Sequence, residues 1–315
     1  MEEARKERHS AIMKKPLVSF AFILTEGMRS VALYLMMKEM IMTEHSIPRI
    51  PLHDGHSIPQ IGLGVWQTPE DQTADVVRKA ISLGYRAVDT ARLYKNEAGV
   101  GEGLEHHPDV CVTTKLWNDD QGYDAALRAF DHSAHLLRRD VIDFYLIHWP
   151  MPHQGQYVET WKALIHLKKE GRVRSIGVSN FAEEHLERII GETGEVPVLN
   201  QIELHPYFQQ KALREFHLKH HIQTEAWRPL GKGAILDNPV IGEIAKRHSK
   251  SPAQIILRWH VQNDLVVIPK SVHPQRMAEN IAVFDFQLNH EEMAQMASLD
   301  RADGRMGEDP MTVRF

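Results

Sequence analysis

Short apolar runs rich in β-branched residues alternate with longer amphipathic stretches along most of the chain. The short runs are typical of buried strands, and the longer stretches repeat apolar residues at the spacing of one helix face. The predicted strands are residues 61–65, 86–89, 110–116, 141–148, 173–179, 198–203, 222–226 and 265–269. The predicted helices are residues 74–83, 124–137, 158–169, 183–190, 211–219 and 252–262, with a further helical pattern at 240–248. The pattern therefore predicts an α/β protein.

Eight strands that are each followed by a helical segment predict a (β/α)8 TIM barrel. No linker rich in Pro, Gly or Ser divides this region, so we assign residues 47–315 to a single barrel domain. The alternative is a doubly wound sheet, which carries a Gly-x-Gly-x-x-Gly turn after a strand. The nearest candidate contains Gly62 and Gly64 but has Gln67 where the third glycine would stand. The barrel is therefore the favoured fold.

Residues 1–46 do not conform to this pattern and are predicted to be an N-terminal extension. They are rich in methionine, and their apolar pieces at 16–24 and 31–37 are interrupted by charged residues. Neither piece approaches the roughly 20 residues that a membrane-spanning helix needs. We interpret the extension as disordered or as the product of an upstream start, with the functional chain beginning near Met42. A weak targeting or membrane role and a partner-binding helix remain alternatives.

Composition and charge exclude several classes of protein. The chain has 315 residues, 43% of them hydrophobic and 25% charged, as in soluble globular enzymes. The net charge of −5 disfavours binding to nucleic acid or to an anionic membrane. The single cysteine, Cys111, excludes an intramolecular disulfide and a Cys-rich zinc site, and it fits a cytoplasmic protein. Adjacent histidines point to different faces of a helix and so do not bind one metal ion together, and no metal is predicted. The protein is expected to be a monomer.

Polar side chains stand at the ends of the predicted strands, where a TIM barrel has its active site. In chain order they are Asp89, Lys115, His148, Ser179 with Asn180, Gln201, Trp227 and Lys270. One such residue alone is usually a helix cap or a solvated end. Because most of these positions are about one barrel unit apart, the fold would aim them at one mouth. The series therefore predicts a functional site.

Tyr94 follows Asp89 closely enough to reach the same mouth from the loop. A phenol has a pKa of about 10, which is too high for a good proton donor at neutral pH. The ammonium of Lys115 would lower the pKa of Tyr94, and the Asp89 carboxylate would keep the lysine charged and oriented. His148 would hydrogen-bond the substrate oxygen. These four residues predict a tuned general acid, which carbonyl reduction requires.

Three motifs resemble the signatures of the aldo-keto reductase family. Residues 84–91 read Gly-Tyr-Arg-Ala-Val-Asp-Thr-Ala and precede Glu97. Residues 174–181 read Arg-Ser-Ile-Gly-Val-Ser-Asn-Phe, and residues 268–271 read Ile-Pro-Lys-Ser. The resemblance covers about residues 47–315 and is greatest to the bacterial 2,5-diketo-D-gluconic acid reductases.

The resemblance implies an NADPH-dependent carbonyl reductase in which Tyr94 is the proton donor, Asp89 and Lys115 tune it, and His148 orients the substrate. The implied cofactor residues are Ser179, Asn180 and Gln201 at the carboxamide, Trp227 on the nicotinamide ring, Leu230 and Gly231 near the pyrophosphate, Lys270, Ser271 and Arg276 at the 2′-phosphate, and Glu279 and Asn280 at the adenine. An arginine fork and a lysine charge independently suit a dianionic phosphate. NADPH is therefore predicted over NADH.

Trp66, Trp117 and Trp149 follow three of the predicted strands and would form an apolar wall at the mouth. The alternative interpretation of each tryptophan is that it only packs against a loop. With His148 they are the predicted substrate residues, and residues 301–315 are expected to fold over the mouth. The resemblance implies small aldehydes, ketones, dicarbonyls or keto-sugar acids as substrates.

Two other functions fit the same fold, because a fold does not determine a function. The first is a non-catalytic NADPH-binding regulatory protein, which would not need Tyr94 and Lys115 together. The second is a barrel enzyme that acts on a phosphorylated substrate, with Lys270 and Arg276 binding its phosphate. The amide groups of Asn180 and Gln201 disfavour the second, since they suit a carboxamide.

Overall fold

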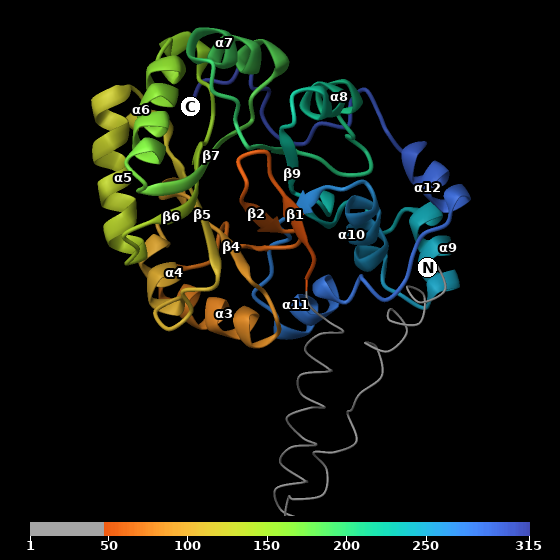
Figure 1. Ribbon diagram of the computed structural model, residues 1–315. Helices are drawn as coiled ribbons and strands as arrows, with labels where there is room; N and C mark the ends of the chain where they lie inside the picture. Colours follow the sequence, from red (N-terminus) through yellow and green to blue (C-terminus); the bar gives the residue numbers. More distant parts are fainter. Residues whose placement is uncertain (1–46) are drawn as a thin grey trace, which may run out of the picture. The chain divides into compact units, whose positions relative to one another are not determined.

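Eight parallel strands form a barrel in residues 47–315, the part of the chain that the computed structural model describes (Figure 1). The strands are β3 (Leu63–Gly64), β4 (Ala87–Asp89), β5 (Cys111–Leu116), β6 (Ile142–Ile147), β7 (Val173–Ser179), β8 (Leu199–Glu203), β9 (Gln223–Trp227) and β10 (Val266–Val267). They pair in chain order from β3 to β10. The predicted (β/α)8 barrel is therefore confirmed, and the doubly wound alternative is wrong.

The barrel closes between its first and last strands. Ile61 pairs with Val267 and Gly64 with Lys270 in parallel bridges. A Cβ atom on Gly64 would lie 2.8 Å from the Ile268 carbonyl oxygen, so this approach requires glycine. Since the closing contacts are isolated bridges, β3 and β10 are shorter than the predicted strands.

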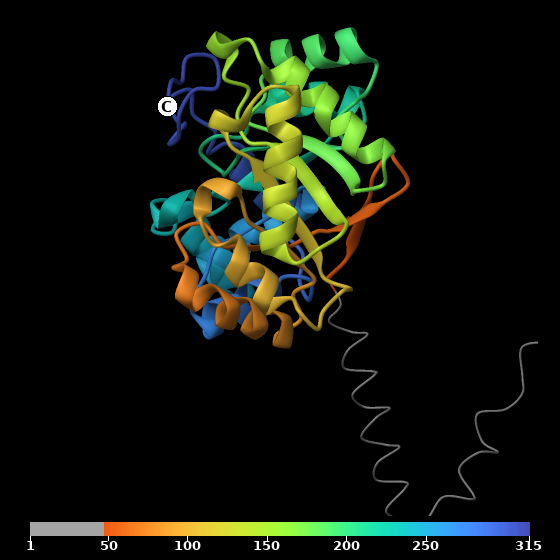
Figure 2. The same cartoon turned by 90° about the vertical axis from the view of Figure 1, so that its left-hand side faces the viewer.

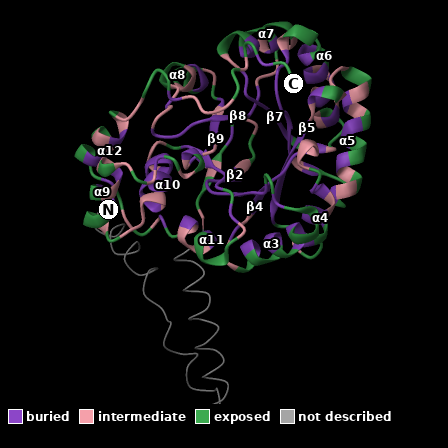
Figure 3. Cartoon of the chain, turned by 180° about the vertical axis from the view of Figure 1, so that it is seen from behind, coloured by how far each residue is buried: buried purple, intermediate pink, exposed green. Residues whose placement is uncertain are grey.

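Helices surround the barrel and turn their apolar faces inward, so that their outer faces are exposed (Figure 3). They are α3 (Glu70–Ser82), α4 (Glu97–Gly103), α5 (Tyr123–Leu137), α6 (Tyr157–Lys169), α7 (Glu183–Thr193), α8 (Lys211–Lys219), α9 (Pro239–His248), α10 (Pro252–Gln262), α11 (Pro274–Ile281) and α12 (His290–Ala297). Short 3-10 turns are η1 (Arg92–Tyr94), η2 (Asn118–Asp120), η3 (Pro152–Gln154) and η4 (Gly231–Gly233). The sequence pattern did not predict α4, whose glycines lower its helix propensity, nor α11 and α12.

A β-hairpin that the sequence pattern did not predict covers one end of the barrel. It consists of β1 (Arg49–Pro51) and β2 (Ser57–Pro59), which pair antiparallel. Leu52 and Ile58 pack in one apolar cluster with side chains from the barrel strands, Ala87 and Cys111 among them. Figure 1 shows the hairpin in the middle of the ring of helices, and Figure 2 shows the C-terminus at the opposite end of the barrel. Among residues 47–315, the hairpin therefore covers one end of the barrel, and we expect a site at the other end.

Within residues 47–315, no helix is long and apolar enough to cross a membrane. The prediction that residues 1–46 are an extension outside the barrel lies outside the described residues. It stays a prediction, as does the assignment of residues 47–315 to one domain.

Candidate active site

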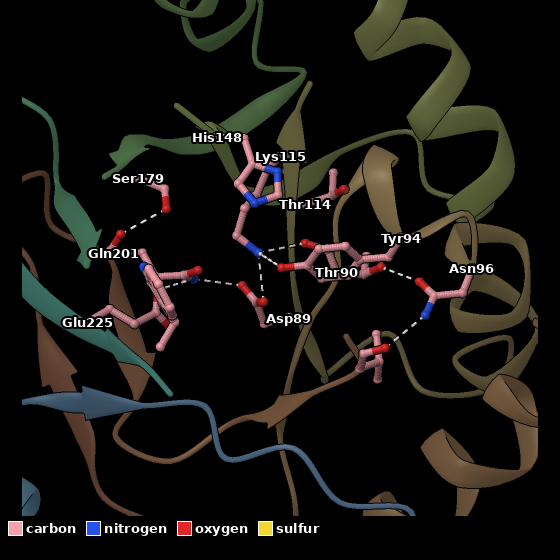
Figure 4. Close-up of polar contacts among 12 residues, drawn as sticks. Asp89, Thr90, Tyr94, Asn96, Thr114, Lys115, His148, Ser179, Gln201 and Glu225 are labelled. Carbon is pink, nitrogen blue, oxygen red and sulfur yellow. Dashed lines mark hydrogen bonds and ion pairs between the residues drawn. The ribbon is translucent and has the colours of Figure 1, made fainter. Parts of the chain in front are cut away.

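The four residues predicted to be catalytic meet at the carboxyl ends of neighbouring strands (Figure 4). Asp89 is the last residue of β4, Lys115 lies in β5 and His148 directly follows β6. Tyr94 is the last residue of η1, which follows β4. Asp89, Lys115 and His148 are buried, and Lys115 is completely inaccessible to solvent.

The Lys115 ammonium is held by three oxygen atoms. Its Nζ donates to Asp89 Oδ1 at 2.7 Å and to the Thr90 carbonyl oxygen at 2.8 Å. The third contact is with Tyr94 Oη at 3.5 Å. Burial lowers the pKa of Lys115, but the Asp89 carboxylate outweighs burial and raises it above its ordinary value. The lysine is therefore a permanent cation aimed at the tyrosine hydroxyl.

The pKa of Tyr94 differs from the expected direction. Burial raises it, and although Lys115 lowers it, the net value lies above that of an ordinary phenol. Lys115 therefore acts in the predicted direction, but it does not bring the pKa of Tyr94 below that of an ordinary phenol. The physical reason is that burial removes water from the phenolate, while the lysine charge is already shared with Asp89.

Asn96 fixes the loop that carries Tyr94. Its Nδ2 donates to the carbonyl oxygens of Val65 at 2.9 Å and Thr68 at 3.2 Å, and its Oδ1 accepts from Thr90 Oγ1 at 2.7 Å. Asn96 is fully buried, so these bonds tie the first two barrel loops together. The tyrosine hydroxyl is thereby held in place near Lys115.

His148 is a neutral imidazole. Burial and the nearby Lys115 ammonium hold its pKa well below the ordinary value. Its ring lies edge-on to Trp117, with centroids 5.1 Å apart, and to Tyr94 at 5.8 Å. Its buried Nδ1 has no hydrogen-bond partner within residues 47–315.

The residues predicted at the nicotinamide adjoin this centre. Ser179 Oγ donates to the Gln201 carbonyl oxygen at 2.8 Å, and Asn180 Nδ2 donates to the His148 carbonyl oxygen at 3.0 Å. Trp227 Nε1 donates to Asn180 Oδ1 at 2.8 Å. Asn180 has a φ of 60°, in the left-handed region that non-glycine residues rarely adopt. The structure therefore brings Ser179, Asn180, Gln201 and Trp227 together.

The residues predicted at the phosphates and the adenine lie at the start of η4, in the segment between β10 and α11, and in α11 itself. The side chains of Lys270 and Arg276 are exposed and make no hydrogen bond or ion pair within residues 47–315. Ser271 is buried, and its Oγ accepts from the His273 amide at 3.1 Å. The remaining predicted residues are Leu230, which is partly buried, Gly231, Glu279, which accepts from Gln275, and Asn280, which is buried.

Aromatic side chains surround Tyr94 and His148. Trp66 is 42% exposed and packs on Tyr94 with centroids 4.7 Å apart. Phe315 packs on Trp117 at 5.4 Å and on Trp149 at 5.3 Å. The three tryptophans therefore lie around Tyr94 and His148, and Phe315, which the sequence did not predict there, packs on two of them.

Glu203 anchors the C-terminal segment, residues 301–315. Its two carboxylate oxygens accept from the Met306 and Gly307 amides, each at 2.8 Å. Burial raises the pKa of Glu203, but these bonds and His205 outweigh burial and lower it overall. Arg228 lies over the Trp227 ring, 4.9 Å from its centroid, and donates to the Met306 carbonyl oxygen. This segment therefore reaches the mouth, as expected, through contacts that the sequence did not predict.

Glu225 is a buried carboxyl in β9 that the sequence analysis missed. Gln201 Nε2 donates to Glu225 Oε2 at 3.0 Å and to Asp89 Oδ2 at 2.8 Å (Figure 4). A signal was present, because Glu225 lies two residues before Trp227 in a predicted strand and therefore shares its face. Because burying a charge is costly, a charged residue in a buried strand indicates a structural or functional role.

Comparison with known proteins places this geometry among reductases. The model of the Aldo/keto reductase family matches residues 60–301. An aldo-keto reductase of Mycolicibacterium smegmatis is 53% identical over 272 residues, which are 85% of this chain and 98% of that protein. Methylglyoxal reductase DkgA of Escherichia coli is 48% identical over 267 residues, which are 83% of this chain and 96% of that protein.

Solved structures agree with this likeness. The crystal structure of Gox0644 in its apo form has 66% sequence identity and a TM-score of 0.85, and the match covers 86% of this chain and 100% of that one. A Gox0644 variant in complex with NADPH has the same TM-score of 0.85.

Proposed function

Since the chain belongs to the aldo/keto reductase family, we propose that it uses NADPH to reduce small aldehydes, ketones, dicarbonyls and keto-sugar acids to alcohols, with Tyr94 as the proton donor. Carbonyl reduction in general follows from the family. The likeness to a structure in complex with NADPH supports the cofactor.

One observation carries the assignment of the proton donor. Lys115 Nζ contacts Tyr94 Oη at 3.5 Å while its other two donors are engaged by Asp89 and Thr90. A regulatory protein that only binds a cofactor gains nothing from a buried ion pair next to a tyrosine, because such a pair is costly to desolvate.

The residues divide the chemistry as follows. A bound nicotinamide supplies the hydride for the carbonyl carbon. Tyr94 donates its proton to the carbonyl oxygen, and the Lys115 ammonium stabilises the phenolate left behind. Asp89 keeps Lys115 charged, and the neutral His148 donates a hydrogen bond that orients the oxygen. Tyr94 then recovers a proton from solvent when the product leaves.

The residues present fit NADPH. Trp227 offers a flat indole held by Asn180, and Ser179, Asn180 and Gln201 offer groups for a carboxamide. Lys270 and Arg276 are exposed cations without partners in the described part of the chain, as binding of a 2′-phosphate requires. Leu230 and Gly231 would lie near the pyrophosphate, Ser271 would join Lys270 and Arg276 at the 2′-phosphate, and Glu279 and Asn280 would lie at the adenine.

The aromatic wall of Trp66, Trp117 and Trp149 restricts the substrate to small molecules, because Phe315 packs against two of the three. Methylglyoxal is the first substrate to test, since DkgA of Escherichia coli is a methylglyoxal reductase. We also propose that the protein is a cytoplasmic monomer without a nucleic acid, membrane or metal partner. Light scattering on the purified chain measures the oligomeric state directly.

The decisive experiment compares Tyr94→Phe with the wild type in NADPH consumption on a panel of dicarbonyls and keto-sugar acids. We expect kcat to fall about 100-fold or more, with NADPH binding unchanged. Equal turnover in both proteins would disprove the assignment of Tyr94. Tight NADPH binding with no turnover in the wild type would favour the regulatory alternative, and absence of NADPH binding would disprove the reductase.

A further inference from the structure

Glu225 lies inside the barrel, in the same layer as the catalytic group. In the strand register it stands between Gln201 on β8 and Val266 on β10. It is 1% exposed, so water does not solvate its carboxyl. Two carboxyls, those of Glu225 and Asp89, therefore share an interior that contains the single ammonium of Lys115.

The hydrogen bonds are unequal between the two carboxyls. Asp89 accepts from Lys115 Nζ at 2.7 Å and from Gln201 Nε2 at 2.8 Å. Glu225 accepts from the same neutral amide nitrogen at 3.0 Å and forms no ion pair within residues 47–315. An ionised Glu225 would be a buried charge without a paired cation, and desolvation disfavours such a charge strongly.

We propose that Glu225 is a neutral carboxyl that positions Gln201 against Asp89. The charges in this layer of the barrel are then balanced, because the Lys115 ammonium faces a single carboxylate, that of Asp89. Glu225 is a positioning residue, since it touches Gln201 rather than the reacting atoms. Its effect on catalysis rests on the proposed role of Tyr94, whereas its protonation state does not.

The electrostatics of the surroundings support this assignment. Burial and then the Asp89 carboxylate raise the pKa of Glu225, the hydrogen bond from Gln201 and the Lys115 charge lower it, and the net value is about 8. Asp89 on β4, Lys115 on β5 and Tyr94 after β4 are the titratable groups that interact with it. Its neighbours on β8 and β10 are an amide and a valine. The pair Asp89 and Glu225 therefore holds one proton more than two free carboxyls would at neutral pH.

Loss of this proton would weaken the general acid. A Glu225 carboxylate raises the pKa of Tyr94, because it disfavours a second negative charge nearby. A weaker acid transfers its proton more slowly, so reduction is expected to slow roughly threefold once Glu225 ionises. The predicted alkaline limb of kcat therefore has a first step near pH 8.

The protonation state is tested on the full-length protein without cofactor or substrate. Infrared difference spectra between wild type and Glu225→Gln at neutral pH should contain the C=O stretch of a protonated carboxyl. In the wild type this band should disappear as the pH is raised through about 8. A carboxylate band at neutral pH in its place would overturn the proposal, whatever the outcome for Tyr94.

The effect on catalysis is tested by the pH profile of kcat. Glu225→Gln keeps the shape of the neutral acid, so it should remove the first step of the alkaline limb. The matched control is Glu97→Gln, which removes a carboxyl that is also buried but is bound by Thr114 and Ser133. The control should keep the step. An unchanged profile in Glu225→Gln, in a protein whose Tyr94→Phe variant is inactive, would refute the positioning role alone.

Discussion

The two ends of the barrel are built from the same strands but differ in what they bury. At the end covered by the hairpin, Leu52 and Ile58 pack against apolar side chains such as Phe144. At the open end, Asp89 and Lys115 are equally buried but form an ion pair. Burial of apolar area stabilises the first end, whereas at the second end each charge must find a partner to avoid a loss of stability.

The change occurs within single strands. In β4, Ala87 belongs to the apolar cluster under the hairpin, and Asp89 binds Lys115 two residues later. In β8, Leu199 belongs to that cluster and Gln201 binds Asp89. Both members of each pair point into the barrel because side chains alternate along a strand. The same face of one strand therefore contributes apolar packing at one end of the barrel and polar side chains of the proposed site at the other.

The largest expected effect is that of Lys115→Met, which should lower both the stability and the activity that depend on the open end. Asp89 would lose its cation, so we expect the free energy of unfolding to fall by about 3–5 kcal/mol and activity to be lost. The loss should grow as the pH rises above the pKa of an unfolded Asp, because the unpaired carboxyl binds its proton more tightly when folded. Urea unfolding at several pH values measures it.

The double variant Asp89→Asn with Lys115→Met separates stability from chemistry. It removes both charges, so most of the stability should return while kcat stays near zero. Recovery of activity in this variant would show that the ion pair has only a structural role.

Ile58→Ala tests the closed end, where we expect a loss of stability without a loss of activity. Ile58 is 2% exposed, and its truncation should lower the free energy of unfolding by about 2–5 kcal/mol. The proposed catalytic residues lie at the other end, so kcat at a temperature where the variant is folded should equal that of the wild type. Thermal unfolding and steady-state kinetics measure the two quantities, and a large fall in kcat would show that the ends are coupled.

Arg276→Ala has a smaller expected effect, limited to the rim of the open end. Loss of its charge should raise the KM for NADPH about tenfold, or about 1.4 kcal/mol, and leave the KM for NADH unchanged. Arg188→Ala on α7, an exposed arginine paired with Glu192, is the matched control and should change neither KM. Equal increases with both cofactors would argue against a contact with the 2′-phosphate.

A chain that starts at Met42 should show the smallest effect. All residues of the proposed site lie within residues 47–315, so kcat and the KM for NADPH should match those of the full chain. A several-fold loss of kcat would assign a catalytic contribution to residues 1–41.

Much of the site was predictable because a barrel gathers the ends of its strands. Asp89, Lys115 and His148 were identified at strand ends, and the structure brings them together with Tyr94. The hairpin and α4 were not predicted, because three-residue strands and a glycine-rich helix leave weak periodic signals. Glu225 was missed because a single charged residue in a strand does not reveal what it faces.

The sequence by itself determined the barrel, the family and the set of reactive side chains, because periodicity and motif spacing are local properties of the chain. Only the tertiary structure decided the charge states. Whether Tyr94 has a raised or lowered pKa depends on its burial and on how Asp89 shares the Lys115 cation. Likewise, the partners of Glu203 and Glu225 come from distant parts of the chain. Desolvation and Coulomb interactions depend on distance in space, which sequence spacing does not specify.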